Sequence, residues 1–451
     1  MSGLYEAAFR HVLFPLYESG LRRRSTLAYL REREAEQWLP PARIAELQWQ
    51  RLKALLQHCW DEVPYYRQRW AAVGAEPGDI RDMQDLARLP VLTKDDIRDN
   101  FETIQARSFA GRMKFKSTGG STGVPLRLGY TRESYERRVA VMLRGYGWAG
   151  ATPGKRALYL WAGVPGASNP LRVSKDGLYH RLFNRRMLDT FPMRDDNLHE
   201  YAEAIERWRP EVIVSYVSPI VRLAQWLVDN GRGIEGVTSV LGASEALHEH
   251  QRALIEAAFP GARAYNTYGC REFMLIASEC GCRDGLHVNA DHLVLELLDD
   301  AGVPAASGNV TLTDLGNYGM PFIRYQNGDM ATMASDGACA CGRGLPRLHS
   351  IDGRKLDTIR SPRGGVLPGA FFPHMLKDVP GIRRFQVKQH RLDALDIAIV
   401  AGPQFNEQQQ QYVRGEIAKL LGDDVAVDLR LVDDIPLTSS GKLRVTISEL
   451  E

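Results

Sequence analysis

A run of glycine and hydroxyl residues between Ser117 and Pro125, "STGGSTGVP", has the composition of a phosphate-binding loop. Glycine permits positive φ and close backbone approach, so the N–H groups of such a loop can surround phosphate oxygens. The spacing differs from that of a Walker A loop, GxxxxGK[ST]. A plain Gly-Ser linker is the alternative, but the flanking segments "MKFK" and "PLRLGYT" both have the pattern of strands. We therefore interpret the run as a loop held in a hairpin.

Cysteine and histidine residues gather in two short segments that lie far apart in the sequence. The first segment, "ECGCRDGLH", contains Cys280, Cys282 and His287, and the second, "CACGRG", contains Cys339 and Cys341. In an intracellular protein such closely spaced Cys and His are typical zinc ligands, and a metal joining two distant loops would stabilise an irregular region. Cys-x-Cys is tighter than the usual Cys-x-x-Cys. Reduced, partly buried thiols are therefore the alternative.

The elements that must position these segments alternate between strand and helix from about residue 105 onward. Apolar runs at Ala157–Trp161, Val212–Val217 and Val237–Leu241 predict buried strands, and His248–Phe259 predicts a helix. This alternation predicts a mostly parallel sheet covered by helices. Longer alternating strands between residues 286 and 335 predict an antiparallel or barrel-like part.

Two further regions complete the expected architecture. Apolar residues recur at helical spacing over residues 40 to 62, and Thr93 is a plausible N-cap of a short helix. The last hundred residues have the pattern of a small α+β unit, with strands at Phe385–Gln389 and Ala394–Val400 before a helix. We expect an α/β fold with domains at residues 1–353 and 354–451, the second being small and α+β.

The composition excludes several classes of protein. The chain has 451 residues with 57 Lys plus Arg and 55 Asp plus Glu, and this balance argues against a dedicated nucleic-acid binder. No apolar run reaches the roughly 20 residues needed to cross a bilayer, and no secretory signal is recognisable, so a cytoplasmic location is expected. The amphipathic stretch Leu4–Tyr17, followed by Arg22, Arg23 and Arg24, is interpreted as a docking helix. A membrane-surface helix is the alternative.

The segment "STGGSTGVPLRLGYT" resembles the phosphate-binding loop of adenylate-forming enzymes, especially the phenylacetate–CoA ligase and CapK-type branch, and three further motifs follow in that family's order. "YNTYGCRE" resembles the aromatic-Gly-x-x-Glu motif, which implies that Tyr268 stacks on adenine and Glu272 binds Mg²⁺. "IRYQNGD" is similar to the family's Tyr-Arg-Thr-Gly-Asp motif, which implies that Asp329 binds ribose, although Gln326 and Asn327 depart from it. "PLTSSGKLRVTISEL" resembles the motif whose lysine, here Lys442, reaches the α-phosphate and the acyl carboxylate.

Two less specific segments also resemble parts of this family. "SIDGRKLDTI" is similar to the hinge between the two domains, where Arg354 would contact ribose, but Leu356 stands at the usual pivot position. "LGASEAL" resembles the loop that lines the adenine and acyl pocket. The resemblance thus implies a nucleotide site formed by the following residues: Ser117, Thr118, Gly119, Gly120, Ser121, Thr122, Gly123, Gly242, Ala243, Ser244, Asn266, Tyr268, Gly269, Asp329 and Arg354.

The resemblance also favours one set of zinc ligands. The cysteine and histidine arrangement of this chain resembles that of CapK-type relatives, which have one Cys and a His in the first loop and two Cys in the second. The expected set, with a structural role, is Cys280, His287, Cys339 and Cys341, and Cys282 is the substitute. Homodimerisation is an expectation of the resemblance alone.

The function implied is activation of a carboxylic acid by ATP and Mg²⁺ to an acyl-AMP, followed by transfer to coenzyme A. In the family the small C-terminal domain swings about the hinge between these steps. Aromatic side chains at Tyr146, Trp161, Tyr216 and Tyr265 would suit an aromatic acid, with a simple core role as the alternative. Two other functions stay open: adenylation with a different acceptor or a non-carboxylate substrate, in polysaccharide or natural-product biosynthesis, and a nucleotide-binding scaffold with degenerate chemistry.

Overall fold

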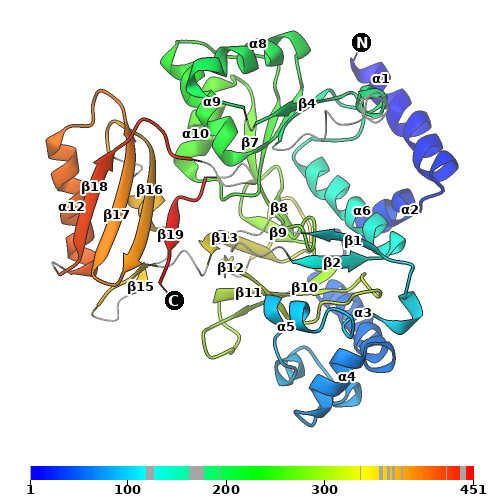
Figure 1. Ribbon diagram of the computed structural model, residues 1–451. Coiled ribbons are helices and arrows are strands. Elements are labelled where there is room, and N and C mark those ends of the chain that lie inside the picture. Colours follow the sequence, from blue (N-terminus) through cyan, green and yellow to red (C-terminus); the bar gives the residue numbers. More distant parts are fainter. Residues whose placement is uncertain are drawn as a thin grey trace. The chain divides into compact units, whose positions relative to one another are not determined.

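The computed structural model describes residues 2–117, 126–161, 177–190, 192–335, 337–354, 359–362, 366–367, 371–376, 379–422, 424–436 and 443–450 (Figure 1). Two compact units are present. The first consists of Met1–Asn327 with Thr332–Ser350, and the second consists of Gly328–Ala331 with Ile351–Glu451.

The sheet of the first unit is parallel in one half. Within the described residues it has eleven strands in the order β10-β11-β12-β13-β9-β8-β7-β6-β5-β3-β4. Strands β4, β3, β5, β6 and β7 pair parallel with one another in that order. Their bounds are β3 (Ala157–Trp161), β4 (Arg185–Asp189), β5 (Val212–Tyr216), β6 (Ser239–Ala243) and β7 (Arg263–Tyr268).

The predicted strands of this half are confirmed, with small shifts at their ends. β6 begins two residues later than expected, after a turn in which Gly236 has a φ of 88°. Strand β5 is buried along its whole length, and its mostly apolar sequence, VIVSY, suits a sheet covered on both faces. Helices α8 (Leu198–Trp208), α9 (Val217–Asp229) and α10 (Glu249–Ala258) pack on these strands (Figure 1).

The other half of the sheet is antiparallel, as one of the two expectations for residues 286 to 335 proposed. β7 pairs antiparallel with β8, β8 with β9, β9 with β13, and β10 with β11. The bounds are β8 (Ala277–Glu279), β9 (Leu286–Val288), β10 (Leu293–Leu298), β11 (Ser307–Asp314), β12 (Tyr325–Met333) and β13 (Arg347–Arg354).

The first part of the chain is helical. Its helices are α1 (Ser2–Ala8), two π-helical segments (Phe9–Leu13 and Leu16–Leu21), α2 (Thr26–Glu36), α3 (Pro41–Glu62), α4 (Pro64–Ala71), α5 (Lys94–Asp99) and α6 (Arg132–Trp148). The helix expected over residues 40 to 62 is confirmed as α3. Thr93 caps α5, because its side chain accepts a hydrogen bond from the backbone N–H of Asp96. Phe9 and Phe14 pack against Phe183, so the first helical stretch docks on the unit through its aromatic side.

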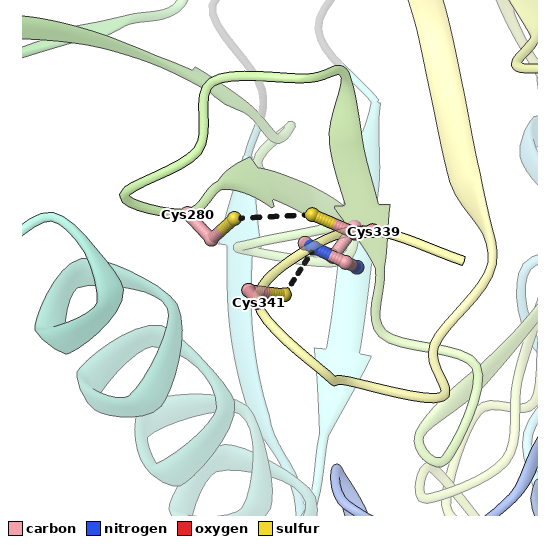
Figure 2. A group of neighbouring side chains, drawn as sticks. Cys280, Cys339 and Cys341 are labelled. Carbon is pink, nitrogen blue, oxygen red and sulfur yellow. Dashed lines mark hydrogen bonds between the residues drawn. The ribbon is translucent and has the colours of Figure 1, made fainter. Parts of the chain in front are cut away.

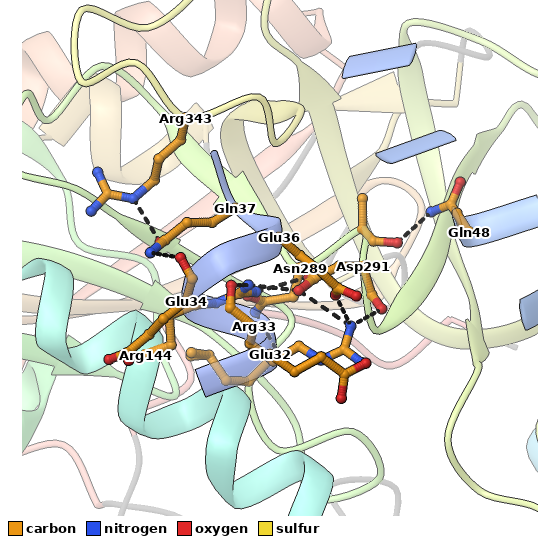
Figure 3. Close-up of polar contacts among 12 residues, drawn as sticks. Glu32, Arg33, Glu34, Glu36, Gln37, Gln48, Arg144, Asn289, Asp291 and Arg343 are labelled. Atoms are coloured by element: carbon orange, nitrogen blue, oxygen red, sulfur yellow. Dashed lines mark hydrogen bonds and ion pairs between the residues drawn. The ribbon is translucent and has the colours of Figure 1, made fainter. Parts of the chain in front are cut away.

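A buried charged network fixes α2 and α6 to the loop between β9 and β10 (Figure 3). Arg144 donates to both carboxylate oxygens of Asp291 at 2.6 and 2.8 Å and to Asn289 Oδ1 at 2.7 Å. Arg33 adds a second guanidinium to Asp291 at 3.4 Å. Burial alone would raise the pKa of Asp291, but Arg144 and then Arg33 hold that pKa well below its ordinary value. The carboxylate of Asp291 is therefore neutralised by two buried guanidinium groups.

The hairpin expected around the glycine-rich run is confirmed by strands β1 (Lys114–Ser117) and β2 (Arg127–Tyr130), which pair antiparallel. Lys114 is opposite Tyr130, and Ser117 is opposite Arg127. Residues 118–125 lie outside the described residues. The hairpin thus holds both ends of the candidate phosphate loop at a fixed separation.

The second unit is a small α+β structure. Its elements are β14 (Ile359–Arg360), β15 (Val366–Leu367), α11 (Phe371–Leu376), β16 (Ile382–Arg391), β17 (Ala394–Ala401), α12 (Glu407–Leu421), β18 (Ala426–Leu431) and β19 (Thr446–Ser448). Four of these strands form a sheet in the order β18-β17-β16-β19. Alternating side chains of β17, such as Leu395 and Ile397, pack with Val413 and Ile417 of α12, which confirms the expected helix. Among the described residues of the whole chain, each helix is too short or too polar to span a bilayer.

Candidate functional site

The candidate substrate residues lie at one edge of the parallel half-sheet. Because parallel strands all end at the same edge, the loops that follow them converge there. Trp161 ends β3, Tyr216 ends β5, Ala243 ends β6 and Tyr268 ends β7. The topology therefore brings together residues that the sequence analysis assigned to the nucleotide and to the acyl group.

The turn after β7 requires glycine at its first position. A Cβ on Gly269 would lie 1.9 Å from the carbonyl oxygen of Met274, which no other residue type can accommodate without backbone movement. Met274 has a φ of 69° and donates its backbone N–H to Cys270 O at 2.7 Å. This tight turn sends the chain back into β8 and places Glu272 between the two strands.

Two buried hydrogen bonds join the motif of residues 265–272 to the motif of residues 323–329. The hydroxyl of Tyr325 donates to Glu272 Oε1 at 2.9 Å. The amide of Asn327 donates to the hydroxyl oxygen of Tyr268 at 2.8 Å. Glu272 is 7% exposed and Tyr325 is 0% exposed, so this carboxylate is held in place by a donor that water does not replace.

The loop after β6 is also fixed by local contacts. The carbonyl of Gly242 accepts a hydrogen bond from Thr267 Oγ1 at 2.8 Å, and a Cβ on Gly242 would meet Val217 at 3.0 Å. Ser244 has a φ of 69°, a left-handed conformation that is costly for serine and characteristic of binding loops. Asn266 is buried, and its backbone N–H donates to Glu279 at 2.7 Å.

The four aromatic candidates lie close together. The rings of Trp161 and Tyr216 have centroids 4.3 Å apart, and Tyr146 and Trp161 pack against a small cluster that contains Tyr265. Burial raises the pKa of Tyr216 and, more strongly, that of Tyr146. Tyr265 and Tyr146 thus contribute to packing whatever else they do, and their contact with an acyl group stays a prediction.

Several expected site residues are described in part or not at all. Ser117 ends β1, and its carbonyl accepts a hydrogen bond from Arg271 at 2.9 Å. Asp329 lies in β12, within the segment that belongs to the second unit, and Arg354 ends β13. The remaining expected residues, which are Thr118, Gly119, Gly120, Ser121, Thr122, Gly123 and Lys442, lie outside the described residues, as does the side chain of Arg354.

The structure brings the four expected zinc ligands into one cluster (Figure 2). The sulfurs of Cys280 and Cys339 are 3.7 Å apart, and Cys341 Sγ lies 3.3 Å from His287 Nε2. All four donor atoms lie within 4.8 Å of one another. Cys282, the substitute, is exposed and does not belong to this cluster.

These distances fit a tetrahedral zinc ion. With Zn–S bonds of about 2.3 Å, tetrahedral geometry separates two sulfurs by about 3.8 Å and a sulfur from a nitrogen by about 3.5 Å. His287 Nδ1 lies 3.3 Å from the carbonyl oxygen of Leu345, which favours a proton on Nδ1 and leaves Nε2 to the cluster. The donor set and its outer contact therefore both suit the metal.

The protonation of the cluster also suits a cation. Burial lowers the pKa of His287 to about 4, so the imidazole is in the neutral form that binds metals. Burial raises the pKa of Cys280 to about 12 and raises that of Cys339. For Cys341 burial acts in the same direction, but hydrogen bonds from Arg343, Cys339 and Cys280 bring the pKa below its ordinary value. A bound divalent ion would favour the thiolate form at all three cysteines.

Sequence reasoning missed the role of Tyr325 and treated Asn327 only as a departure from a motif. A signal for Tyr325 was present, because it stands at the start of the same motif, "YQNGD". That its hydroxyl meets Glu272 depends on the pairing of distant strands. Sequence spacing alone does not show it.

Comparison with known proteins finds a family match for the C-terminal part of the chain and relatives that match most of its length. Residues 359–449 match the family model of the CapK C-terminal domain. The chain is 27% identical to a phenylacetate-coenzyme A ligase of Thermus thermophilus, covering 90% of this chain and 96% of that protein. It is 22% identical to protein CapK of Staphylococcus aureus, covering 81% of each.

A solved structure shares the fold. The crystal structure of 2-hydroxyisobutyryl-CoA ligase, in the postadenylation state, matches with a TM-score of 0.73 at 20% identity, covering 92% of this chain and 91% of that chain. The order of motifs, the contacts between them and these likenesses agree. They support the branch of adenylate-forming enzymes that the motifs resemble, that of the phenylacetate–CoA ligases and CapK.

Proposed function

We propose that this protein uses ATP to activate a carboxylic acid as an acyl-AMP and then transfers the acyl group to coenzyme A. The observation that carries the proposal is the pair of buried hydrogen bonds that joins Tyr325 to Glu272 and Asn327 to Tyr268. A scaffold needs no buried carboxylate held in this way. The likeness to the phenylacetate-coenzyme A ligase of Thermus thermophilus, which covers 90% of this chain, supports the same reaction class.

The nucleotide would lie at the carboxyl edge of β5, β6 and β7. Tyr268, oriented by Asn327, would stack on adenine, and Asp329 and Arg354 would bind the ribose hydroxyls. Tyr325 occupies Oε1 of Glu272 and leaves Oε2 for Mg²⁺, which prefers carboxylate oxygen. When bound, Mg²⁺ neutralises charge on the ATP phosphates.

The first step forms one bond and breaks one. A carboxylate oxygen of the acid attacks the α-phosphorus, and the bond to the bridging oxygen breaks, so pyrophosphate leaves with the electron pair. Residues 117–123 would hold the phosphates, and Lys442 would stabilise charge on the α-phosphate and the acyl carboxylate. Catalysis is then mainly positioning and electrostatics.

The second step transfers the acyl group. The coenzyme A thiol loses its proton, the sulfur attacks the acyl carbon, and the bond to AMP breaks, so AMP leaves. We assign the first step to an adenylating domain at residues 1–353. A C-terminal domain at residues 354–451, which carries Lys442, would move to switch the enzyme from the first step to the second. Because both ATP and coenzyme A are available in the cytoplasm, we place the reaction there.

The acid that fits best is aromatic. Trp161 and Tyr216, 4.3 Å apart at the ends of neighbouring strands, offer ring faces at the edge where the carboxylate must meet the α-phosphate. Tyr146 and Tyr265 would support them from the adjoining cluster.

The cysteine and histidine cluster would hold zinc in a structural role. Cys280 and His287 come from the β8–β9 region, and Cys339 and Cys341 come from the segment before β13. Joining them would fix two irregular segments of the first unit. Zinc bound by four protein ligands has no open position for substrate, so no catalytic step is assigned to it.

ATP–pyrophosphate exchange against a panel of aromatic and aliphatic acids tests the adenylation step, and coenzyme A-dependent AMP release tests the transfer. We expect exchange with aromatic acids, its loss in Lys442→Ala, and AMP release that requires coenzyme A. Pyrophosphate exchange together with AMP release that is equal with and without coenzyme A would indicate another acceptor. An absence of exchange with every acid, while ATP still binds, would overturn the proposal in favour of a non-carboxylate substrate or a nucleotide-binding scaffold.

A further inference from the structure

A pocket of about 460 Å³ lies between the end of the second π-helical segment, the β1–β2 hairpin and the start of α6. Five of its lining residues are cationic and one is a carboxylate, Glu136. The cations are Arg22, Arg24, Lys114, Lys116 and Arg132. All of them belong to the first unit, and none has a role in the proposed adenylation.

The carboxylates near this pocket are already engaged. Glu136 Oε1 accepts from Arg132 at 2.8 Å, and its Oε2 accepts from the backbone N–H of Ser25 at 2.9 Å. Arg24 pairs with Glu18 at 3.1 Å. Within the part of the chain that the structure describes, no carboxylate forms an ion pair with the remaining three cations, Arg22, Lys114 and Lys116.

The backbone of this region is built to hold the cations together. Arg132 donates to the carbonyl oxygens of both Arg22, at 3.0 Å, and Arg23. Arg23 has a φ of 49°, a conformation that costs a non-glycine residue free energy. The turn therefore places Arg22 and Arg24 beside Arg132 in the wall of the pocket.

Lys116 is held by the aromatic wall of the pocket. Its Nζ lies 4.8 Å from the ring centroid of Tyr130 and 4.9 Å from that of Tyr135. Partial loss of hydration, then the positive charges of Arg138, Arg271 and Lys114, lowers the pKa of this lysine. A bound anion would stabilise the charged ammonium group and so oppose both the loss of hydration and the repulsion by the neighbouring cations.

We propose that this pocket binds a small organic molecule that carries two or more phosphate groups. Arginine and lysine are the side chains that recognise phosphate, and three cations without carboxylate partners exceed what one monoanion neutralises. The volume is in the range of small-molecule sites, about 300–1,000 Å³, and leaves room for an organic part against the tyrosine rings. The proposal does not depend on the ligase activity.

Binding to the full-length protein tests it, with adenosine 3′,5′-bisphosphate, pyrophosphate and inorganic phosphate as probes in isothermal titration calorimetry. The variant Arg22→Ala/Lys114→Ala removes two unpaired, exposed cations and leaves Lys116, next to the candidate phosphate loop, intact. The matched control is Lys53→Ala/Arg263→Ala, which removes the same charge from exposed positions outside this pocket. Equal melting temperatures would show that each variant is folded.

We expect the pocket variant to bind adenosine 3′,5′-bisphosphate about tenfold or more weakly than wild type, with the control within about twofold. Hydrogen exchange should show protection of residues 20–25 and 127–136 by this probe, lost only in the pocket variant. Tighter binding of the bisphosphate than of pyrophosphate would identify an organic phosphate, and the reverse order would identify the diphosphate as the ligand group. Equal weakening in both variants, or protection confined to other segments, would overturn the proposal.

Discussion

Replacing Tyr325 by phenylalanine tests whether the buried hydrogen bond positions Glu272 for magnesium. The bond is 2.9 Å long, and its two residues are 0% and 7% exposed, so water cannot substitute for the lost hydroxyl. A hydrogen bond to a charged group contributes about 1.5–3 kcal/mol. Since about 1.4 kcal/mol corresponds to a factor of ten, the Mg²⁺ concentration for half-maximal activity should rise about 10- to 100-fold.

The assay is ATP–pyrophosphate exchange against free Mg²⁺ at saturating ATP and acid. Glu272→Gln should abolish the exchange, because an amide is a poor ligand for this ion. Tyr5→Phe is the control, since its hydroxyl also donates a long-range hydrogen bond, to Leu182 O at 2.7 Å, and Tyr5 is not part of the site. An unchanged Mg²⁺ dependence in Tyr325→Phe, or an equal shift in Tyr5→Phe, would refute the assignment.

Three further changes probe stability. Arg144→Met removes the two short bonds to the buried Asp291 and leaves it only the longer ion pair with Arg33, so it should lower the free energy of unfolding by about 3 kcal/mol. Arg137→Met, in an exposed pair on the same helix, should cost under about 0.5 kcal/mol. Equal losses in urea denaturation would contradict this. A chelator or Cys341→Ser should release about one zinc per chain and lower the melting temperature. The control Cys282→Ser should do neither, and metal analysis that finds no zinc in the wild-type protein would contradict the zinc site. Burial lowers the pKa of His292 to about 4, so the unfolded chain binds one more proton from about pH 6.5 down to 4, and stability should fall by about 3 kcal/mol over that range. His292→Gln should remove the part of the slope that His292 contributes and leave the part from His287, whose pKa is also lowered to about 4. A slope that His292→Gln leaves unchanged would contradict the prediction.

The α/β fold and its strands could be predicted because their signals are local. Val212–Tyr216 is mostly apolar and rich in β-branched residues, and Pro41–Glu62 has apolar residues at helical spacing. The short strand β19 was missed, because three residues at the end of the chain carry no periodic pattern and the strand exists only through pairing with β16.

The charged network around Asp291 could not be predicted for the same reason. Arg33, Arg144 and Asp291 are separated by more than a hundred residues along the chain, and each reads as an ordinary surface charge in its own segment. Only the packing of α2 and α6 against the β9–β10 loop makes them buried partners. The four expected zinc ligands are different, because closely spaced cysteines are rare enough to suggest a metal cluster before the fold is known, and the structure brings these four residues together.

Asn327 departs from the family motif and yet joins it to a second motif of the candidate site. The sequence has Gln326 and Asn327 where the family pattern has Arg and Thr, which by itself weakens the resemblance. In the fold, the Asn327 amide donates to the hydroxyl oxygen of Tyr268 at 2.8 Å, and Asn327 is 3% exposed. The amide N–H therefore fixes the position of the tyrosine hydroxyl. The buried tyrosine is therefore oriented by the residue that departs from the pattern, and the unusual Asn is an argument for a working nucleotide site.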